Sequence, residues 1–185
     1  MSILGKLESV HVAQTPSEFQ EVYRLRYQVY VNELQKGFLK NIDHKNRYIK
    51  DPEDERPESV VMYTVTDGMV SGTMRLDAYT SATASQEILN RFNIKALNLD
   101  HDQVFTESCR LIISEKYRGG HILPALARKA YQLNTQIFKA IYSFQYGNAG
   151  LVDYYRKLGF RPYAAELIHN EDGIRIPMIN VVNDV

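Results

Sequence analysis

The alternation of hydrophobic and polar residues along the chain predicts a series of strands. Two apolar runs flank Asp67-Gly68, and this dipeptide favours a hairpin because a type I′ turn needs positive φ at both central positions. Another apolar run covers residues 107–114, and runs of this length are typical of buried strands. We therefore expect strands over residues 7–13, 60–66, 69–76, 107–114, 141–146, 160–168 and 174–182, with a turn at Glu171-Asp172-Gly173.

Helical spacing is present in four stretches. Thr15-Pro16-Ser17-Glu18 has the residue types of a helix start, because a hydroxyl side chain caps free amides, Pro fits the first turn and an acid stabilises the positive end of the helix dipole. Apolar and aromatic residues then recur at helical spacing to about Leu34. Residues 36–58 are polar and interrupted by prolines, which predicts a long loop. Further helices are expected over residues 85–93, 123–138 and 150–158, the last of them ended by Gly159.

The order of these elements predicts an α/β or α+β fold. The strand–helix–strand segment at residues 107–146 requires a parallel pair of strands joined by a right-handed crossover. Hairpins on either side of it add antiparallel strands, so we expect a mixed central sheet with helices on both faces. The length of 185 residues suits a single domain, which we place over residues 1–185.

Composition excludes several classes of protein. Hydrophobic residues make up 44% of the chain and charged residues 24%, which is typical of a globular protein and not of a disordered one. The lone Cys109 excludes a disulfide framework, and the five histidines lack the spacing of a metal site. No run of apolar residues is long enough for a membrane span or a signal peptide. We expect a soluble, cytoplasmic protein.

Positive charge is concentrated in the middle of the chain. The whole sequence has 22 basic and 22 acidic residues, but residues 107–161 contain 9 basic and only 3 acidic ones. A basic region in an otherwise neutral chain indicates a local anionic ligand and not nucleic-acid binding. The alternative is a set of solvated lysines and arginines scattered over the surface.

Two stretches in this basic region contain candidate chemistry. In the first, Arg118-Gly119-Gly120-His121 leads from a strand into a helix, and the free amides at a helix start bind anions. The second covers residues 148–160 and includes Tyr155, whose phenol could act as a general acid. Each stretch has an ordinary alternative, namely a glycine turn in the first case and a packed tyrosine in the second.

Together the two stretches resemble the GNAT N-acyltransferase superfamily. Tyr155-Arg156-Lys157-Leu158-Gly159-Phe160 matches the Tyr-x-x-x-Gly-Phe ending of that family's helix. Arg118 fits the family's phosphate-binding turn, whereas His121 and Leu123 occupy its two small positions. The resemblance implies a GNAT-like fold and a thioester donor whose carbonyl is polarised by backbone amides near Leu111 and Ile113. The donor-binding residues that it implies are Leu111, Ile113, Arg118, Gly119, Gly120, His121 and Asn148.

A narrower resemblance lies in the first half of the chain. Four segments, in the right order, are similar to motifs of the acyl-homoserine-lactone synthases and the related N-acyl amino acid synthases. They are Leu25-Arg26-Tyr27-Gln28-Val29-Tyr30, Asp51-Pro52-Glu53-Asp54, Gly72-Thr73-Met74-Arg75-Leu76 and Glu107-Ser108-Cys109-Arg110. The lactone synthases carry a tryptophan shortly after the first helix and this chain has none, which counts against the lactone-precursor substrate.

Attack of an amine on a thioester requires a proton acceptor for the amine and a proton donor for the thiolate. Glu107 is the candidate base and Tyr155 the candidate acid. A salt bridge from Glu107 to Arg110 or Arg75 is the alternative. The resemblance implies an acceptor pocket formed by Arg26, Tyr30, Arg75 and Arg110. Arginines of this kind can bind a carboxylate bidentately, although surface pairs with Asp51, Asp54 or Asp77 are the alternative.

The sequence therefore predicts an N-acyltransferase that moves an acyl group from a thioester to the amine of a small, amino-acid-like acceptor. The donor is acyl-CoA or the phosphopantetheine of an acyl-carrier protein, which the basic region would suit as a partner. A plain acetyl-CoA-dependent acetyltransferase, an acyl-homoserine-lactone synthase and a non-catalytic ligand-sensing module remain alternatives. We expect no nucleic-acid partner, no bound metal and no covalent cofactor, and the oligomeric state is open.

Overall fold

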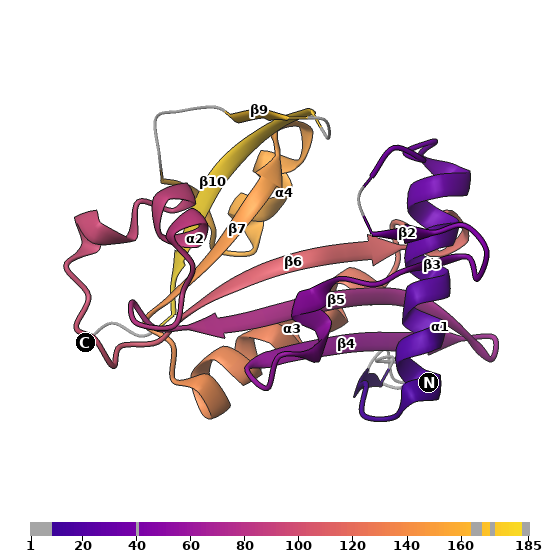
Figure 1. Ribbon diagram of the computed structural model, residues 1–185, viewed down its shortest axis with the longest axis horizontal. Helices are drawn as coiled ribbons and strands as arrows, with labels where there is room; N and C mark the ends of the chain where they lie inside the picture. Colours follow the sequence, from indigo (N-terminus) through magenta and orange to yellow (C-terminus); the bar gives the residue numbers. More distant parts are fainter. Residues whose placement is uncertain (1–8, 40, 164–167, 171–172, 183–185) are drawn as a thin grey trace, which may run out of the picture. The chain divides into compact units, whose positions relative to one another are not determined.

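The structure, a computed structural model, describes residues 9–39, 41–163, 168–170 and 173–182, and they fall into two compact units (Figure 1). The first unit is formed by Met1–Leu76 and Arg110–Lys129, and the second by Asp77–Cys109 and Ala130–Val185. Strands β5 (Met69–Tyr79) and β6 (Phe105–Ile113) contribute residues to both units. The expectation of one domain over residues 1–185 stays a prediction.

Three strands at the start of the chain form the hairpin sheet of the first unit. Strand β1 (Val10–Val12) pairs antiparallel with β4 (Ser59–Thr66), and β4 continues into β5. The turn between them has φ of 53° at Asp67 and 77° at Gly68, as a type I′ turn requires. The hairpin prediction is confirmed, and the strand order in this unit is β1-β4-β5-β6.

Helix α1 (Pro16–Tyr27) begins where the sequence predicts. Thr15 and Glu18 form a capping box, in which each side chain accepts a hydrogen bond from the other residue's backbone amide. Backbone amides of Gln14 and Thr15 lower the pKa of the Glu18 carboxyl to about 2. The helix continues as a π-helix over Gln28–Glu33, so the helical segment ends one residue before the predicted Leu34.

The predicted loop over residues 36–58 contains short regular elements, so that interpretation was wrong in part. Strands β2 (Ile42–Asp43) and β3 (Tyr48–Ile49) pair with each other, and Pro52–Glu55 forms a 3₁₀ helix. Strands of two residues have no detectable period, which explains why the sequence pattern missed them. Ile49 is fully buried and anchors this segment in the first unit.

The second unit has a parallel pair at its centre. Strand β6 pairs in parallel with β7 (Tyr142–Asn148), with Glu107 opposite Phe144 and Ser108 opposite Gln145. This pairing confirms the predicted crossover. Strand β10 (Gly173–Val181) is antiparallel to β7 and also pairs with β8 (Arg161–Pro162) and β9 (Ile168–Asn170). The strand order in this unit is β5-β6-β7-β10-β8. Residues 164–167 of the predicted strand and 171–172 of the predicted turn lie outside the described residues.

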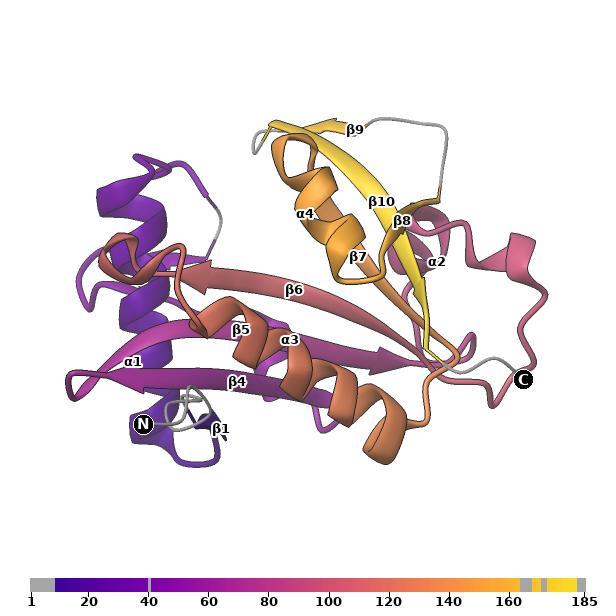
Figure 2. The ribbon, with the colours of Figure 1, turned by 180° about the vertical axis from the view of Figure 1, so that it is seen from behind.

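Helices cover opposite faces of the sheet in each unit, as the sequence predicts. In the first unit α1 lies in front of the strands in Figure 1, and α3 (Ile122–Gln132), which continues as a π-helix over Leu133–Phe138, lies in front in the reverse view of Figure 2. In the second unit α2 (Gln86–Arg91) lies in front of the strands in Figure 1, and α4 (Val152–Lys157) lies in front of them in Figure 2. Short 3₁₀ helices cover Ile94–Leu97, Glu115–Tyr117 and Ala149–Leu151.

Each unit has a hydrophobic core. Val22, Val61 and Tyr63 pack together in the first unit, and Phe92, Phe105 and Phe144 in the second. The rings of Phe92 and Phe144 stack with their centroids 4.9 Å apart. Within the described residues, no helix combines the length and the apolar character that crossing a bilayer demands.

Close packing of α3 on β5 gives the first testable prediction. A Cβ atom added to Gly72 would lie 2.5 Å from Cγ2 of the buried Ile122. Gly72→Ala should therefore lower the free energy of unfolding by about 1–3 kcal/mol, the usual cost of overpacking a core. Urea denaturation of this variant measures the loss. Gly37→Ala is the control, because nothing lies within 4 Å of its added Cβ, and an equal loss in both variants would contradict the packing argument.

Candidate active site

A cluster of three arginines and two aspartates lies in the first unit, and all of its members except the partly exposed Arg110 are buried. Arg26 on α1 is fully buried, and its guanidinium donates two hydrogen bonds to the Asp54 carboxylate, at 2.6 and 2.9 Å. Asp51 is the N-cap of the 3₁₀ helix Pro52–Glu55, and Asp54 is its third residue. The Asp54 carboxylate also accepts from the Asp51 backbone amide at 2.8 Å, which fixes both carboxylates in one orientation.

Two further arginines complete this cluster. Arg75 on β5 donates from Nη1 to Asp51 Oδ2 at 3.0 Å and to Asp54 Oδ1 at 3.2 Å. Arg110 on β6 donates to the two oxygens of Asp51 at 2.5 and 2.7 Å. The structure thus brings together three arginines from distant parts of the sequence. We call Arg26, Asp51, Asp54, Arg75 and Arg110 the arginine–aspartate cluster.

Asp51 and Asp54 already bind the arginines that were expected to bind the carboxylate of the acceptor. The arginines therefore pair with Asp51 and Asp54, as the alternative interpretation of the sequence expected. That interpretation placed the pairs on the surface, whereas both aspartates are buried in the structure. Asp77 accepts a hydrogen bond from Cys109 Sγ at 3.4 Å. Burial is possible because the opposite charges lie within hydrogen-bond distance of one another.

Three arginines face the two aspartates of the cluster, and the partly exposed Glu53 carboxylate lies 3.9 Å from Arg75 as a further partner. Burial would raise the pKa of the Asp51 carboxyl, but the positive charges of Arg110, Arg26 and Arg75 outweigh it and the pKa is lowered. Burial would likewise lower the pKa of Arg110, but the Asp51 charge raises it overall. The Arg110 side chain is 28% exposed, the most of the three arginines. The Arg110 guanidinium is therefore the most accessible positive charge of the cluster.

Arg110 also has an unusual backbone. Its φ is 51°, in the left-handed region, although it lies inside strand β6. A left-handed residue interrupts the regular alternation of a strand, and this interruption comes directly before Leu111. The guanidinium lies 5.7 Å from the centroid of the Tyr30 ring. Of the predicted acceptor residues, Tyr30 and Arg110 are thus the pair that remains partly accessible.

The predicted donor turn is exposed and held by an acid that sequence analysis missed. Arg118 donates from Nε to the carbonyl of Ile113 at 3.0 Å, and its guanidinium forms an ion pair with Glu33 at the end of the π-helix. The Glu33 carboxylate also accepts from the Glu115 amide. These partners are more than 80 residues apart in the sequence, so no local pattern could have identified Glu33.

The glycines of this turn leave the start of α3 open. Gly119 has φ of 78°, which only glycine adopts at little cost, and nothing lies within 4 Å of a Cβ added there. Gly120 and His121 are exposed, and α3 begins at the next residue. The first amides of this helix therefore offer an anion site beside Arg118.

Glu107 is buried in the second unit and has a partner that the sequence did not predict. Its Oε1 accepts from Arg91 Nη1 at 3.1 Å, and the predicted alternative of a bridge to Arg110 or Arg75 stays a prediction. Arg91 lies on α2, pairs with the exposed Glu87 at 2.5 Å and is 5.6 Å from the Tyr146 ring. Burial would lower the pKa of Arg91, but the Glu107 charge raises it overall. Arg91 is a site residue that sequence analysis missed.

Asn148 is the last residue of β7 and Tyr155 lies on α4, both in the second unit. The Tyr155 ring packs over Gly147, where an added Cβ would be 3.1 Å from two ring carbons. Asn148 is exposed, and its Oδ1 accepts from the Gly150 amide at 2.9 Å, so it caps the 3₁₀ helix Ala149–Leu151. In the described part of the chain no group of histidine, cysteine or acidic residues is arranged to hold a metal ion.

Titration of Asp51 gives a prediction for this cluster. Because the folded pKa of Asp51 lies below its ordinary value near 3.8, its ionised form stabilises the fold fully above pH 4 and the contribution is lost as pH falls further. Asp51→Asn should lower the free energy of unfolding at pH 7 by roughly 3–5 kcal/mol, because buried arginines lose a partner. Below pH 4 the difference from the unsubstituted protein should narrow.

Denaturation curves between pH 2.5 and 7 measure this difference. Asp102→Asn, at an exposed position, is the control and should follow the unsubstituted protein at every pH. A gap between Asp51→Asn and the unsubstituted protein that stays constant down to pH 2.5 would contradict the role of Asp51.

Comparison with known proteins connects these residues to a family. The family model of the N-acyl amino acid synthase FeeM matches residues 21–178. The structure of FeeM, an N-acyl amino acid synthase from uncultured soil microbes, is similar with a TM-score of 0.74 at 15% identity, covering 95% of this chain and 91% of FeeM. No curated protein matches the sequence significantly.

Two other solved structures share the fold. An acyl-CoA N-acyltransferase from Pseudomonas aeruginosa has a TM-score of 0.67 at 18% identity, with 94% of this chain and 99% of that chain covered. BjaI, a CoA-dependent acyl-homoserine lactone synthase, has a TM-score of 0.69 at 13% identity, with 95% of this chain and 84% of BjaI covered. The predicted GNAT fold is confirmed, and the chain is an acyltransferase that belongs to the FeeM N-acyl amino acid synthase family.

Proposed function

We propose that this acyltransferase uses an acyl-CoA donor and acylates the amine of a small acceptor that carries a carboxylate, as an amino acid does. The observation that carries the proposal is that Arg110, beside the Tyr30 ring, is the most exposed arginine of the arginine–aspartate cluster. An arginine beside an aromatic ring is well suited to recognise a carboxylate. Acyl transfer to an amine itself follows from the family.

Arg26 and Arg75 have a supporting role in this proposal. Both are buried and bound to Asp54, so they hold the acidic segment and do not bind the acceptor directly. Asp51 in turn orients Arg110 through two hydrogen bonds. The acceptor carboxylate would then contact Arg110 and Tyr30, which narrows the pocket of four residues predicted from the sequence to two direct contacts.

Glu107 and Tyr155 are proposed to move the protons. The amine nitrogen attacks the thioester carbonyl, the carbon–sulfur bond breaks, the amine proton passes to Glu107 through water, and the Tyr155 phenol protonates the departing thiolate. The hydrogen bond from Arg91 at 3.1 Å holds the Glu107 carboxylate in place. Backbone amides near Leu111 and Ile113 are proposed to polarise the carbonyl.

The donor is proposed to bind with its phosphates at Arg118, Gly119, Gly120 and His121, where the start of α3 offers free amides. Asn148 is proposed to contact the pantetheine arm. Solved relatives described as acyl-CoA-dependent or CoA-dependent support acyl-CoA. An acyl-carrier protein remains the second candidate donor, because the basic excess of residues 107–161 would attract an acidic partner. We also propose a cytoplasmic location.

A donor and acceptor panel tests this function. Thiol release is measured from acetyl-CoA, a long-chain acyl-CoA and an acyl-carrier protein, each against pooled amino acids and against the matching amines that lack the carboxylate. We expect the fastest release with long-chain acyl-CoA and amino acids. Preference for acetyl-CoA and simple amines would indicate an acetyltransferase, lactone formation from S-adenosylmethionine would indicate a lactone synthase, and no release with any pair would indicate a ligand-sensing module.

Replacement of the proposed base gives a sharper prediction. Glu107→Gln keeps the size and hydrogen bonding of the side chain but cannot accept a proton, so kcat should fall by about 100-fold, as expected for a general base. Glu87→Gln is the matched control, because Glu87 also pairs with Arg91 but is 77% exposed. Steady-state kinetics and thermal denaturation are measured for both. Equal kcat in the two variants, with both folded, would remove Glu107 from the mechanism.

A further inference from the structure

Glu33 is the last residue of the π-helix Gln28–Glu33, and its side chain is only 10% exposed. A carboxylate shielded from solvent needs hydrogen-bond donors. Its donors come from the turn that follows β6. The Arg118 guanidinium forms an ion pair with Glu33 Oε2, and the Glu115 amide donates to the two carboxylate oxygens at 3.4 and 3.3 Å. One side chain of the π-helix therefore contacts the proposed donor turn.

Glu33 ends a π-helix, whose turns are wider than those of an α-helix. The Leu34 amide donates to the Val29 carbonyl at 2.9 Å, five residues earlier in the chain. Such π-helical turns are rare and often occur at functional sites. The same π-helix contains Tyr30, which we propose as an acceptor contact. One element thus contributes a side chain to each of the two proposed substrate sites.

The backbone of the donor turn has anchors other than Glu33. The Ser114 amide donates to the carbonyl of Ser71 on β5 at 3.0 Å. The Tyr117 hydroxyl donates to Asp67 Oδ2, in the turn between β4 and β5, at 3.0 Å. These contacts remain when the Glu33 carboxylate is removed. The effect of its removal therefore falls mainly on the arginine that it binds.

Glu33 and the Ile113 carbonyl bind the same edge of the Arg118 guanidinium. Nε donates to the Ile113 carbonyl at 3.0 Å, and Nη2 binds Glu33. The Nη1 group has no acceptor among the described residues, and the Arg118 side chain is 42% exposed. A guanidinium is planar with five N–H donors in fixed directions. Fixing one edge therefore determines where the remaining donors point.

We propose that Glu33 is a positioning residue for the acyl donor, which holds Arg118 in the orientation that binds the donor phosphates. This inference rests on the proposed function, which places those phosphates at Arg118. An exposed arginine without such a partner has many rotamers, and ordering it when a ligand binds costs affinity. Glu33 reduces that cost because it orders the side chain before the donor binds.

The negative charge of Glu33 has the opposite effect on the donor. A carboxylate repels phosphates, so removal of its charge alone would strengthen the binding of an anionic donor. Charges more than about 8 Å apart are largely screened at an ionic strength of about 0.15 M. At this ionic strength we expect the loss of orientation to dominate. The sign of the change in affinity therefore distinguishes positioning from a simple effect of charge.

Calorimetric titration of the full chain, without an amine acceptor, tests this role. The probes are octanoyl-CoA and S-octanoylpantetheine, which share the acyl chain and the thioester arm, whereas only octanoyl-CoA carries the phosphorylated nucleotide. Glu33→Ala should weaken octanoyl-CoA binding by about 3- to 10-fold, the effect of ordering one arginine side chain. It should leave S-octanoylpantetheine binding unchanged. A merely structural role of Glu33 would weaken the binding of both probes.

A double-mutant cycle tests whether Glu33 acts through Arg118. Arg118→Ala should weaken octanoyl-CoA binding by about 10-fold, the effect of one charged hydrogen bond. Glu33→Ala added to Arg118→Ala should not weaken binding further, because the side chain that Glu33 orients is then absent. Thermal denaturation of each variant confirms that it is folded.

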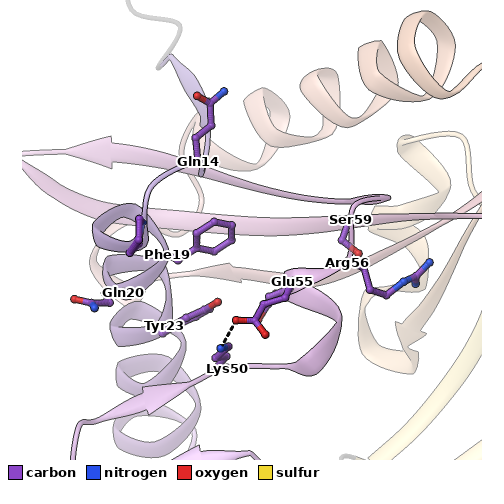
Figure 3. Close-up of a pocket in the computed structure, with 10 residues that line it drawn as sticks. Gln14, Phe19, Gln20, Tyr23, Lys50, Glu55, Arg56 and Ser59 are labelled. Carbon is purple, nitrogen blue, oxygen red and sulfur yellow. Dashed lines mark hydrogen bonds and ion pairs between the residues drawn. The ribbon is translucent and has the colours of Figure 1, made fainter.

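Two acids of the first unit with other partners provide matched controls. Glu21→Ala removes an exposed acid that pairs with Arg24 on α1. Glu55→Ala removes the exposed partner of Lys50 at a cavity of about 580 Å³ between α1 and the segment that leads into β4 (Figure 3). Each variant removes one negative charge, as Glu33→Ala does. Both should bind octanoyl-CoA as the unsubstituted protein does.

The possible failures of the two proposals are distinguishable. If Arg118→Ala binds octanoyl-CoA as the unsubstituted protein does, the donor site of the proposed function is wrong and the role of Glu33 is overturned with it. If Arg118→Ala weakens binding, the role of Glu33 alone is overturned by any of three results. These are unchanged or tighter octanoyl-CoA binding by Glu33→Ala, an equal loss for S-octanoylpantetheine, and an equal loss in the two control variants.

Discussion

The buried pairing of Asp51 and Asp54 with three arginines is the interaction on which the first unit depends. It joins α1, the 3₁₀ helix Pro52–Glu55, β5 and β6 through hydrogen bonds of 2.5–3.2 Å. Removal of one partner leaves an uncompensated buried charge, which is strongly destabilising. The same pairing orients Arg110, the most exposed of the three arginines, through its two hydrogen bonds to Asp51.

Much of the fold could be predicted from the sequence because its signals are local. Asp67-Gly68 determines a turn by its backbone preference, and Thr15 with Glu18 determines a helix start by capping. The two-residue strands β2 and β3 were missed because they carry no period. They are held by tertiary packing of Ile49, which sequence patterns do not record.

Most residues of the candidate site could be predicted from the sequence, but several of their ion-pair partners could not. Short motifs identified Arg26, Arg75, Arg110 and Glu107, but they did not identify Arg91, which donates to Glu107. Glu33, the partner of Arg118, was missed for the same reason. Ion pairs between distant segments depend on how strands and helices pack, and charge alone does not select one arginine among several. The proton-transfer roles of Glu107 and Tyr155 stay predictions.

The central proposal is that the partly exposed Arg110 guanidinium selects an acceptor with a carboxylate. The most direct measurement is the ratio of kcat/KM for the preferred amino acid to that for the amine lacking its carboxylate, in the unsubstituted protein and in Arg110→Gln. The account predicts a ratio of about 100 that falls to within a few-fold of one in the variant, as the loss of a charged hydrogen-bond pair implies. An unchanged ratio in a folded Arg110→Gln variant would contradict it.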